Sequence, residues 1–336
     1  MSNPEIRKVS DVPQNHIVDF FERRHIKPEI TRWKYFDEEF NAGRNRGYVA
    51  LDENRPIGFI GLIPFRASVR STTIDTAWTC DWHIDDNYRS SMIGIMLLKK
   101  AIASYPSVFH AGGNENTRKV FSRLASHTHV DGVSSFHCDL RLGTQIRRIK
   151  ARLPWIRVAP IDLLARLPLL GKIRRTAKPE DRLQEGLAES FISTVGQQFY
   201  ETDYHPAYDR EFLEWQLNRC PPLKCFSYVG DNGVTAVAWY IRRPTTDWRM
   251  IFRQTVLNSV DLEKCLQSAK ALAFDEGADS IKVLISQEDT QQRTTLLNNG
   301  FTQGENYYFY SFSRPGELPA ECMSGLSFLD VDFAYL

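Results

Sequence analysis

The sequence predicts an α+β fold that occurs twice, each copy being a mixed, mostly antiparallel sheet flanked by helices. An aromatic-bearing helix followed by a β-hairpin pattern occurs at 33–63 and again at 215–241. A strand followed by a capped helix occurs at 107–124 and aligns without gaps with 280–297. Because the length of 336 residues also suits two domains, we expect two copies of one unit.

In the first half, β-branched and aromatic residues flank Asp52-Glu53-Asn54, which is a typical signal for a hairpin turn. A further strand ends near Ile84, a helix is expected over 92–104, and the next strand over 107–110. The helix after it begins at Asn114-Glu-Asn-Thr, whose polar side chains can cap it. The order is therefore helix, helix, hairpin, strand, helix, strand, helix, strand.

The second half repeats this order. Its hairpin turn is Asp231-Asn232-Gly233, its long helix is expected over 261–276, and Gly300 follows the last helix as a glycine C-cap. Each half thus has the same succession of elements, which is the pattern that two related domains would give.

The formal charges nearly cancel, with 42 Lys and Arg against 41 Asp and Glu, so a dedicated nucleic-acid binder is not expected and DNA is not a predicted partner. We predict domains at 1–142 and 190–336, joined by a basic linker at 143–189. Residues 143–178 of this linker contain many Lys and Arg but only one acidic residue, Asp162. Two interpretations are open: a linker whose apolar face packs across both domains, or a surface that contacts anionic lipid head groups or phosphates.

No apolar run approaches the roughly 18 residues of a membrane helix, and Met1-Ser2-Asn3-Pro4-Glu5 lacks the basic and apolar regions of a signal peptide. A cytoplasmic protein is therefore expected, peripheral to the inner face of the membrane if the basic segment contacts lipid. The 6 cysteines form no C-x-x-C pair, so neither a disulfide framework nor a metal site is expected. The nearest metal candidate, His127-x-His129 with His137 and Cys138, also fits one face of a strand.

Residues 79–101 carry the pattern that is most informative about chemistry. Strand-like alternation ends near Ile84, a polar turn follows, and Arg89, Ser90-Ser91 and Gly94 lead into an apolar helix. The N–H groups and dipole of a helix N-terminus attract anions, and small residues let the backbone approach a phosphate. Since Arg89 adds a fixed positive charge, this turn predicts a phosphate-binding site.

The same segment resembles the acetyl-CoA signature of the GNAT N-acetyltransferases, in which a strand ends in a valine-like residue and Arg or Gln-x-x-Gly-x-Gly or Ala precedes a Leu-rich helix. The matching residues are Ile84, Tyr88, Arg89, Ile93 and Gly94. Met92 stands where the first glycine usually is, and Ser90-Ser91 replace the usual Gly-Lys. The resemblance covers roughly 45–142 and 190–313, and the chain looks like two GNAT-like domains in tandem, similar to Fem-like proteins and to members associated with bacterial surface polysaccharide synthesis.

The resemblance implies that acetyl-CoA or another acyl-CoA binds in the first half as co-substrate. The residues implied to bind it are Ile84, Tyr88, Arg89, Ser90, Ser91, Met92, Ile93, Gly94, Asn114 and Asn116. The equivalent loop of the second half, Val256–Glu263, has neither Arg nor Gly, so we expect a single acyl-CoA site.

A base for the acceptor amine is expected at the end of the strand before the loop. Asp81 and His83 share one face of that strand, and either could deprotonate an ammonium directly or through water. His110 on the adjacent strand lies near the same place, as a third catalytic candidate or as a satisfied core histidine. The resemblance implies a Tyr as general acid for the departing thiolate, but Phe121 stands at the matching place.

Three functions follow as hypotheses. The first is an acyl-CoA-dependent N-acyltransferase, most simply an acetyltransferase, acting on an amino sugar or another small-molecule or nucleotide-linked amine in surface polysaccharide synthesis. The second is a Fem-like transferase that uses aminoacyl-tRNA, with 143–178 holding the RNA. The third is a non-catalytic binding or scaffold protein in which Met92 marks a decayed loop. Contact with a membrane or with polysaccharide machinery would also use 143–178.

Overall fold

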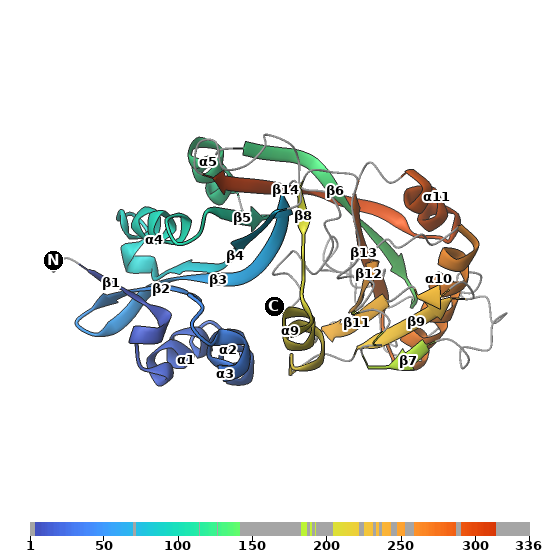
Figure 1. Cartoon of the computed structure of the whole chain (residues 1–336), viewed down its shortest axis with the longest axis horizontal. Coiled ribbons are helices and arrows are strands. Elements are labelled where there is room, and N and C mark those ends of the chain that lie inside the picture. The colour runs from blue at the N-terminus through green and yellow to red at the C-terminus, as the bar shows by residue number, and fades with distance from the viewer. Residues whose placement is uncertain are drawn as a thin grey trace, which may run out of the picture.

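The structure is a computed structural model, and twelve segments of it are described together with residues 189 and 192. The segments are 4–69, 72–113, 115–125, 127–141, 183–186, 204–221, 225–230, 233–234, 237–242, 247–252, 259–286 and 290–313. The predicted basic segment at 143–178 lies outside them. Figure 1 shows one long curved sheet through the molecule, with helices on both of its faces.

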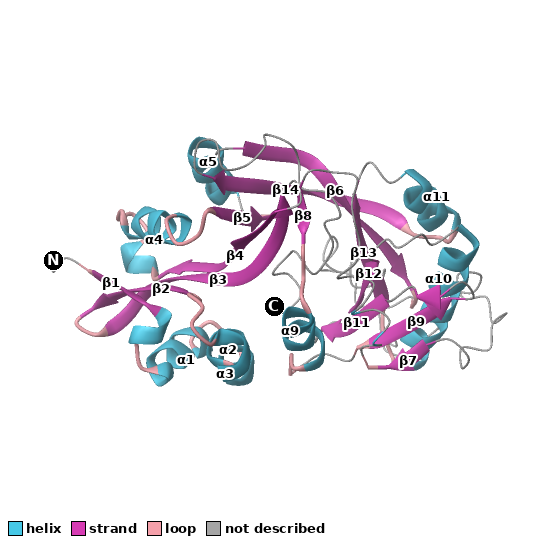
Figure 2. Cartoon of the chain, viewed as in Figure 1, coloured by secondary structure: helices cyan, strands magenta, loops and turns pink. Residues whose placement is uncertain are grey.

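The first half contains the succession of elements that its sequence predicts, preceded by a short strand that the pattern did not indicate. Helices α1 to α3 come before a three-stranded meander, and two helix–strand steps follow it (Figure 2). The elements are β1 (Glu5–Lys8), a 3-10 turn (Val9–Asp11), α1 (Gln14–Glu22), α2 (Pro28–Phe36), α3 (Glu38–Asn41), β2 (Gly47–Asp52), β3 (Arg55–Val69), β4 (Thr72–Ile84), a 3-10 turn (Asp86–Tyr88), α4 (Ile93–Ile102), β5 (Ser107–Ala111), α5 (Glu115–Leu124) and β6 (His127–Asp139).

The second half follows a similar course in its described residues. A short helix continues into a turn of π-helix, and a group of strands then precedes two helix–strand steps. The elements are β7 (Leu183–Glu185), β8 (Tyr204–Pro206), α9 (Arg210–Leu213), the π-helical turn (Glu214–Asn218), β9 (Phe226–Gly230), β10 (Gly233–Val234), β11 (Val237–Arg242), β12 (Asp247–Phe252), α10 (Ser259–Asp275), β13 (Ser280–Ser286), α11 (Thr290–Asn298) and β14 (Thr302–Ser313).

The main sheet confirms the predicted α+β class. Its strand order is β1-β2-β3-β4-β5-β14-β6-β13-β12-β11, with β8 added beside β3, and a smaller sheet has the order β10-β9-β7. Only β4–β5 and β12–β13 are parallel among the described pairs, and all other described pairs are antiparallel. The sheet is therefore mixed and mostly antiparallel.

The last strand of each half pairs with a strand of the other half. β14 lies between β5 and β6, and β6 pairs with β13. Read outward from the β14–β6 pair, the order is β5, β4, β3 in one direction and β13, β12, β11 in the other. One sheet therefore contains strands from both predicted domains. The domain bounds at 142 and 190 stay a prediction from the sequence.

The two tryptophans that mark the sequence repeat lie against each other. Their rings stack with centroids 4.6 Å apart. The indole N–H of Trp33 donates to the carbonyl of Trp215 at 2.9 Å, and the indole N–H of Trp215 donates to the carbonyl of Trp33 at 3.2 Å. Because both side chains are buried and both N–H groups are paired, this contact fixes α2 against the α9 region.

Apolar packing holds helices on both faces of the first-half strands. Phe20, Phe21 and Phe59 belong to the core between α1, α2 and the sheet, while Leu97 and Phe121 belong to the core beneath α4 and α5 on the other face. A third core lies between α10 and β13. None of the described helices is long and apolar enough to cross a membrane.

Candidate functional site

A cavity of about 890 Å³ opens at the C-terminal end of β4, where the polar loop leads to α4. Side chains from four segments line it: the end of α1, the β2–β3 turn, the end of β4 with its loop, and the start of α5. In that order they are Arg23 and Arg24; Arg55; Trp82, His83, Ile84, Asp85, Asp86, Asn87 and Arg89; Asn116, Thr117 and Val120.

The sheet opens at this cavity because β4 and β5 diverge. The two strands pair in parallel only where residues 76–78 face 107–109. β4 then continues to Ile84, with no further pairing to β5 among the described residues. Backbone groups along this stretch of β4 are therefore placed to meet a ligand.

A β-bulge bends β4 just before the cavity. Cys80 pairs with Gly61 and His83 pairs with Phe59, so two residues of β4 stand opposite one residue of β3. Asp81, inside the bulge, adopts the left-handed region with a φ of 46°. This conformation is costly for a residue other than glycine, so contacts of its side chain must hold it.

The loop after β4 ends at the N-terminus of α4, whose first amides precede the first helical hydrogen bond. The first helical hydrogen bond of α4 runs from the amide of Met96 to the carbonyl of Met92 at 2.9 Å. The amides of Gly94-Ile95 precede it, and the hydroxyl of Ser91 accepts from the amide of Ile93 at 3.3 Å. The Ser91 hydroxyl itself donates to the carbonyl of Tyr88 at 2.6 Å. The end of α4 thus offers backbone N–H donors to an anion.

Gly94 and Arg89 complete this end of the helix. A Cβ at Gly94 would lie 3.3 Å from the Trp82 ring, so glycine lets the helix approach the strand closely. The Arg89 side chain is 72 % exposed and forms an ion pair with Asp86 at 2.7 Å. An exposed pair is weakly held, so this guanidinium is able to turn to a phosphate. These residues fit the pyrophosphate of an acyl-CoA.

The remaining loop residues support the site from outside the cavity. The hydroxyl of Tyr88 donates to Asp52 at 2.5 Å, which ties the loop to β2 and raises the pKa of Tyr88. Ile93 is buried in the core, Ser90 is exposed, and Met92 is 61 % exposed without lining the cavity. The Met92 side chain therefore does not fill this cavity.

His83 is the titratable candidate that the structure places in the cavity. Its Nε2 atom is buried and has no hydrogen-bond partner among the described residues, and its ring meets the edge of Phe21 with centroids 6.0 Å apart. Burial lowers the pKa of His83 below its ordinary value; the charge of Asp81 opposes this shift and that of Arg24 adds to it. A neutral imidazole with a free nitrogen can accept a proton.

Asp81 serves the bulge and does not reach the cavity. Its Oδ2 atom is 2.8 Å from the ammonium of Lys34 and also accepts a hydrogen bond from the hydroxyl of Tyr35. The side chains of Lys34 and Asp81 are only 3 % and 4 % exposed. Burial works to raise the pKa of Asp81, but Lys34 and the hydrogen bonds hold it below its ordinary value. We therefore assign Asp81 to the support of the bulge instead of the predicted role of base.

His110 also lies apart from the cavity. Its Nδ1 atom is 2.7 Å from the hydroxyl of Thr79, and its ring packs on Phe121 with centroids 4.3 Å apart. Burial lowers the pKa of His110 to about 3. The structure thus favours the core-histidine alternative over the catalytic one. Of the two predicted asparagines, Asn116 lines the cavity and Asn114 lies outside the described residues.

Sequence reasoning missed the arginines on the opposite wall. Arg24 pairs with the Oδ1 atom of Asp85, in the loop after β4, and Arg55 lies 3.6 Å from the Oδ2 atom of the same carboxylate. Arg23 precedes Arg24 at the end of α1. These residues are far from the loop in sequence, and an Arg-Arg pair at a helix end was the one signal that could have indicated them.

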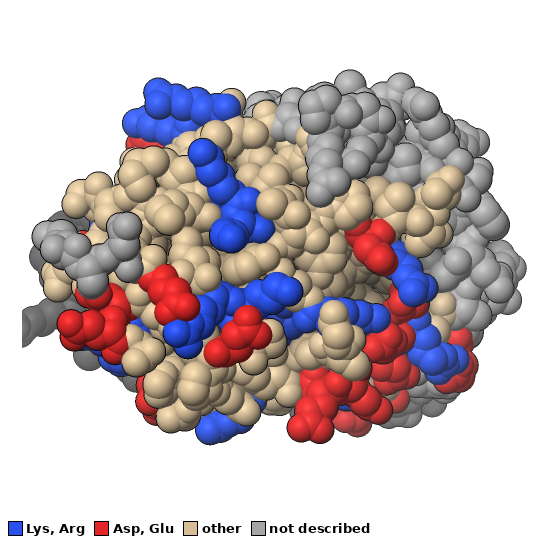
Figure 3. All heavy atoms as spheres, turned by 60° about the vertical axis from the view of Figure 1, so that its left-hand side comes forward, with Lys and Arg blue, Asp and Glu red and all other residues tan. Residues whose placement is uncertain are grey.

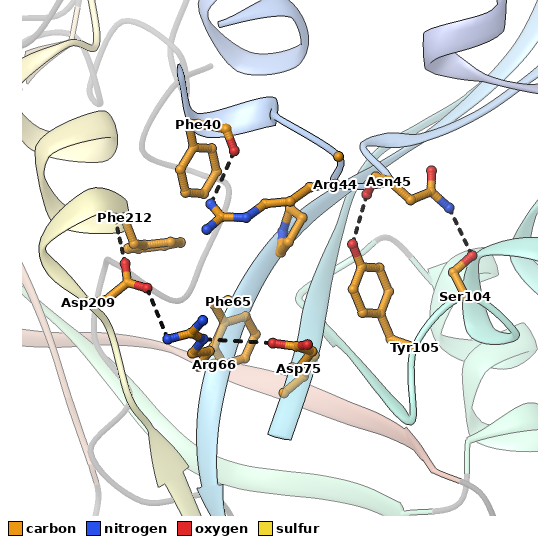
Figure 4. Close-up of a pocket in the computed structure, with 13 residues that line it drawn as sticks. Phe40, Arg44, Asn45, Phe65, Arg66, Asp75, Ser104, Tyr105, Asp209 and Phe212 are labelled. Carbon is orange, nitrogen blue, oxygen red and sulfur yellow. Dashed lines mark hydrogen bonds and ion pairs between the residues drawn. The ribbon is translucent and has the colours of Figure 1, made fainter. Parts of the chain in front are cut away.

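A second cavity, of about 370 Å³, lies near the other end of β4 (Figure 4). It contains no predicted site residue. Figure 4 shows Arg66 between Asp75 and Asp209, at 3.8 and 4.0 Å respectively. Arg44 is likewise paired, with Glu211 at 2.8 Å. Since its charges neutralise one another, this cavity is a weaker candidate than the one at the end of β4.

Comparison with protein families agrees with this geometry. Residues 12–123 match the model of the acetyltransferase (GNAT) family. Over these residues the chain is similar to the GNAT acetyltransferases. The matched residues include α1 to α4 and all of α5 except Leu124, and hence every described residue that lines the larger cavity.

Solved structures show that the likeness of fold extends beyond residues 12–123. N-myristoyltransferase of Saccharomyces cerevisiae, solved with bound myristoyl-CoA and inhibitors, matches with a TM-score of 0.60 and 13 % identity over 98 % of this chain and 86 % of that chain. A conserved protein of Enterococcus faecalis V583, described as a probable N-acyltransferase, matches with a TM-score of 0.55 and 10 % identity over 92 % of this chain and 72 % of that chain. No curated protein matches the sequence.

No group of three or more His, Cys, Asp or Glu side chains suited to a metal ion occurs in the described part of the chain. Cys138, part of the nearest candidate in the sequence, is fully buried in the core around α10.

Proposed function

We propose that this chain is an acyl-CoA-dependent N-acyltransferase that transfers an acetyl group to an amine. The observation that carries the proposal is the meeting, in one cavity, of the loop that leads to α4 and of His83, whose Nε2 atom has no hydrogen-bond partner among the described residues. The match of residues 12–123 to the model of the GNAT family supports it. A phosphate site beside a neutral base is what transfer from a CoA thioester to an amine needs.

The residues suited to hold the co-substrate are on the α4 side of the cavity. The amides of Gly94-Ile95 and the side chain of Arg89 would hold the phosphates, and Asn116 could donate from α5. When bound, acetyl-CoA supplies the acyl group in activated form.

His83 would take the proton of the attacking amine. The reaction forms a C–N bond and breaks the C–S bond, so the amine must lose a proton and the CoA thiolate must gain one. The lowered pKa of His83 keeps its imidazole neutral at neutral pH, and the neutral ring has one nitrogen that can accept a proton. Since the cavity is open to solvent, water can protonate the thiolate without a dedicated acid at the position of Phe121.

Packing behind the bulge favours a short acyl group. The space there is only about 10 Å³, bounded by α1 and α2 side chains that include Phe21, Lys34 and Tyr35. We expect acetyl-CoA to react faster than acyl-CoA with longer chains, by about 10- to 200-fold once the chain exceeds the room available. A series from acetyl- to decanoyl-CoA, with release of CoA measured, checks this. Equal rates along the series would contradict it.

Binding of the co-substrate can be tested on Arg89. We expect calorimetric titration to show micromolar binding of acetyl-CoA, and Arg89→Glu to weaken it at least about tenfold, because a charge that attracts phosphate is replaced by one that repels it. Arg123→Glu makes the same change at an exposed position of α5 outside the cavity and should leave binding unchanged. Equal losses in both variants would count against the assigned site.

Absence of acetyl-CoA binding by the unaltered protein would contradict the proposal as a whole. The aminoacyl-tRNA and scaffold hypotheses from the sequence would then be favoured. The amino-sugar acceptor and the role in surface polysaccharide synthesis are proposals that rest on the sequence resemblance, and amino sugars therefore belong in the panel of acceptors.

A further inference from the structure

The cavity at the end of β4 carries an excess of positive charge. Four arginines and two aspartates line it, and no lysine or glutamate does so among the described residues. On the face that Figure 3 shows, Lys and Arg are interspersed with Asp and Glu. The excess is thus a feature of the cavity and does not continue a uniformly basic surface.

The arginines divide between the two faces of β4. Trp82 and Ile84 point toward α4, since a Cβ at Gly94 would lie 3.3 and 3.6 Å from them. His83 points the other way, toward Phe21 of α1. Arg89 belongs to the α4 side, where the phosphates of the co-substrate are proposed to bind, whereas Arg23-Arg24 belong to the α1 side, where the free nitrogen of His83 lies.

Arg24 is held in place before any ligand binds. Its guanidinium lies 3.6 Å from the centroid of the Phe20 ring and donates to the Phe20 carbonyl at 2.6 Å. It also pairs with Asp85, and both side chains are about four-fifths buried, at 20 % and 19 % exposure. A guanidinium fixed in this way keeps N–H groups that can bind an anion at low entropic cost.

Arg23 provides the charge that Asp85 does not balance. It is exposed, lines the cavity, and takes part in no ion pair among the described residues. Its guanidinium lies 5.9 Å from the Phe20 ring centroid, on the same aromatic ring as that of Arg24. Two adjacent guanidiniums, of which only that of Arg24 is paired with a carboxylate, match a ligand that has a negative charge of its own.

We infer that the acceptor is an anionic amine, whose carboxylate or phosphate is held by Arg23 and Arg24 while its amino group faces His83. This inference rests on the proposed function. Arg24 is close enough to His83 for its charge to contribute to the lowered pKa of that histidine, which supports the arrangement. An anion bound between them would bring its amine to the same wall of the cavity.

The experiment compares matched amines with and without the anion, at saturating acetyl-CoA. One pair is glucosamine 6-phosphate and glucosamine, and the other is serine and serinamide, so the two arms separate phosphate from carboxylate. We expect kcat/KM to be about 10- to 100-fold higher for the anionic member of at least one pair. Arg23→Gln should remove most of that preference through KM for the acceptor, with KM for acetyl-CoA unchanged.

Arg32→Gln is the matched control, because Arg32 is an exposed arginine of α2 that does not line the cavity. Equal kcat/KM within both pairs would overturn the inference, as would acylation of neither class by protein that binds acetyl-CoA. A rise in KM for acetyl-CoA in Arg23→Gln, with acceptor preference intact, would also overturn it and would assign Arg23 to the co-substrate. Failure to bind acetyl-CoA is a separate result, which contradicts the proposed function itself.

Discussion

Replacing His83 with Gln is expected to lower kcat by about 100- to 10,000-fold, the range that general-base catalysis typically contributes. Glutamine has nearly the same size and can keep polar contacts at the cavity wall, but it cannot accept a proton at neutral pH. Because Arg89 and the α4 amides are untouched, calorimetric binding of acetyl-CoA should not change. Steady-state release of CoA in the presence of an amine that the unaltered protein acylates measures the effect.

The pH dependence of kcat is a second, independent test of the role of His83. Burial holds the pKa of His83 below 6.5, so kcat should fall with acidification through a midpoint below 6.5 as the imidazole becomes protonated. His83→Gln should lack this limb of the profile. His16→Gln, on the first turn of α1 and outside the cavity, is the control. A variant at 83 with full activity, or with the same acid limb, would show that another group removes the proton.

The class of fold could be predicted from sequence because it depends on local patterns. The hairpin turn at 52–54 is one case: Glu53 and Asn54 have φ values of 48° and 66°, as its polar residues indicate. The pairing of β14 with β5 and β6 could not be predicted, because the strand patterns of 127–139 and 302–313 fit either half equally well. Which strand lies beside which is decided by long-range packing that no local pattern records.

The candidate site could likewise be predicted only in part. The loop from Ile84 to Gly94 is contiguous in sequence, so its residues could be identified together. Arg24 reaches the cavity from another helix, and the side chain of Asp81 is withdrawn from it by Lys34, a partner in α2. Spacing along β4 correctly indicated that Asp81 and His83 share a side, but it carried no information about which of them would already be paired.

Lys34→Met is expected to destabilise the fold by about 3–5 kcal/mol, the cost of leaving one member of a buried ion pair without its partner. Methionine matches the length and volume of lysine, so the loss reports mainly the unpaired carboxylate of Asp81. Urea unfolding followed by circular dichroism measures the free energy of unfolding. The pKa of Asp81 in the folded state lies below its ordinary 3.8, so the pair's contribution is present above about pH 4 and is lost as the pH falls through the folded-state pKa.

Lys119→Met supplies the matched control for this prediction. Lys119 and Glu115 of α5 are also 2.8 Å apart, but their side chains are 65 % and 75 % exposed, so losing that pair should cost under about 0.5 kcal/mol. If the two variants lose similar stability, the Lys34–Asp81 pair does not hold the bulge. The bulge positions His83 two residues further along β4, and Lys34→Met should therefore also lower kcat at temperatures where it remains folded. A destabilised variant with unaltered kcat would separate the pair's structural role from catalysis.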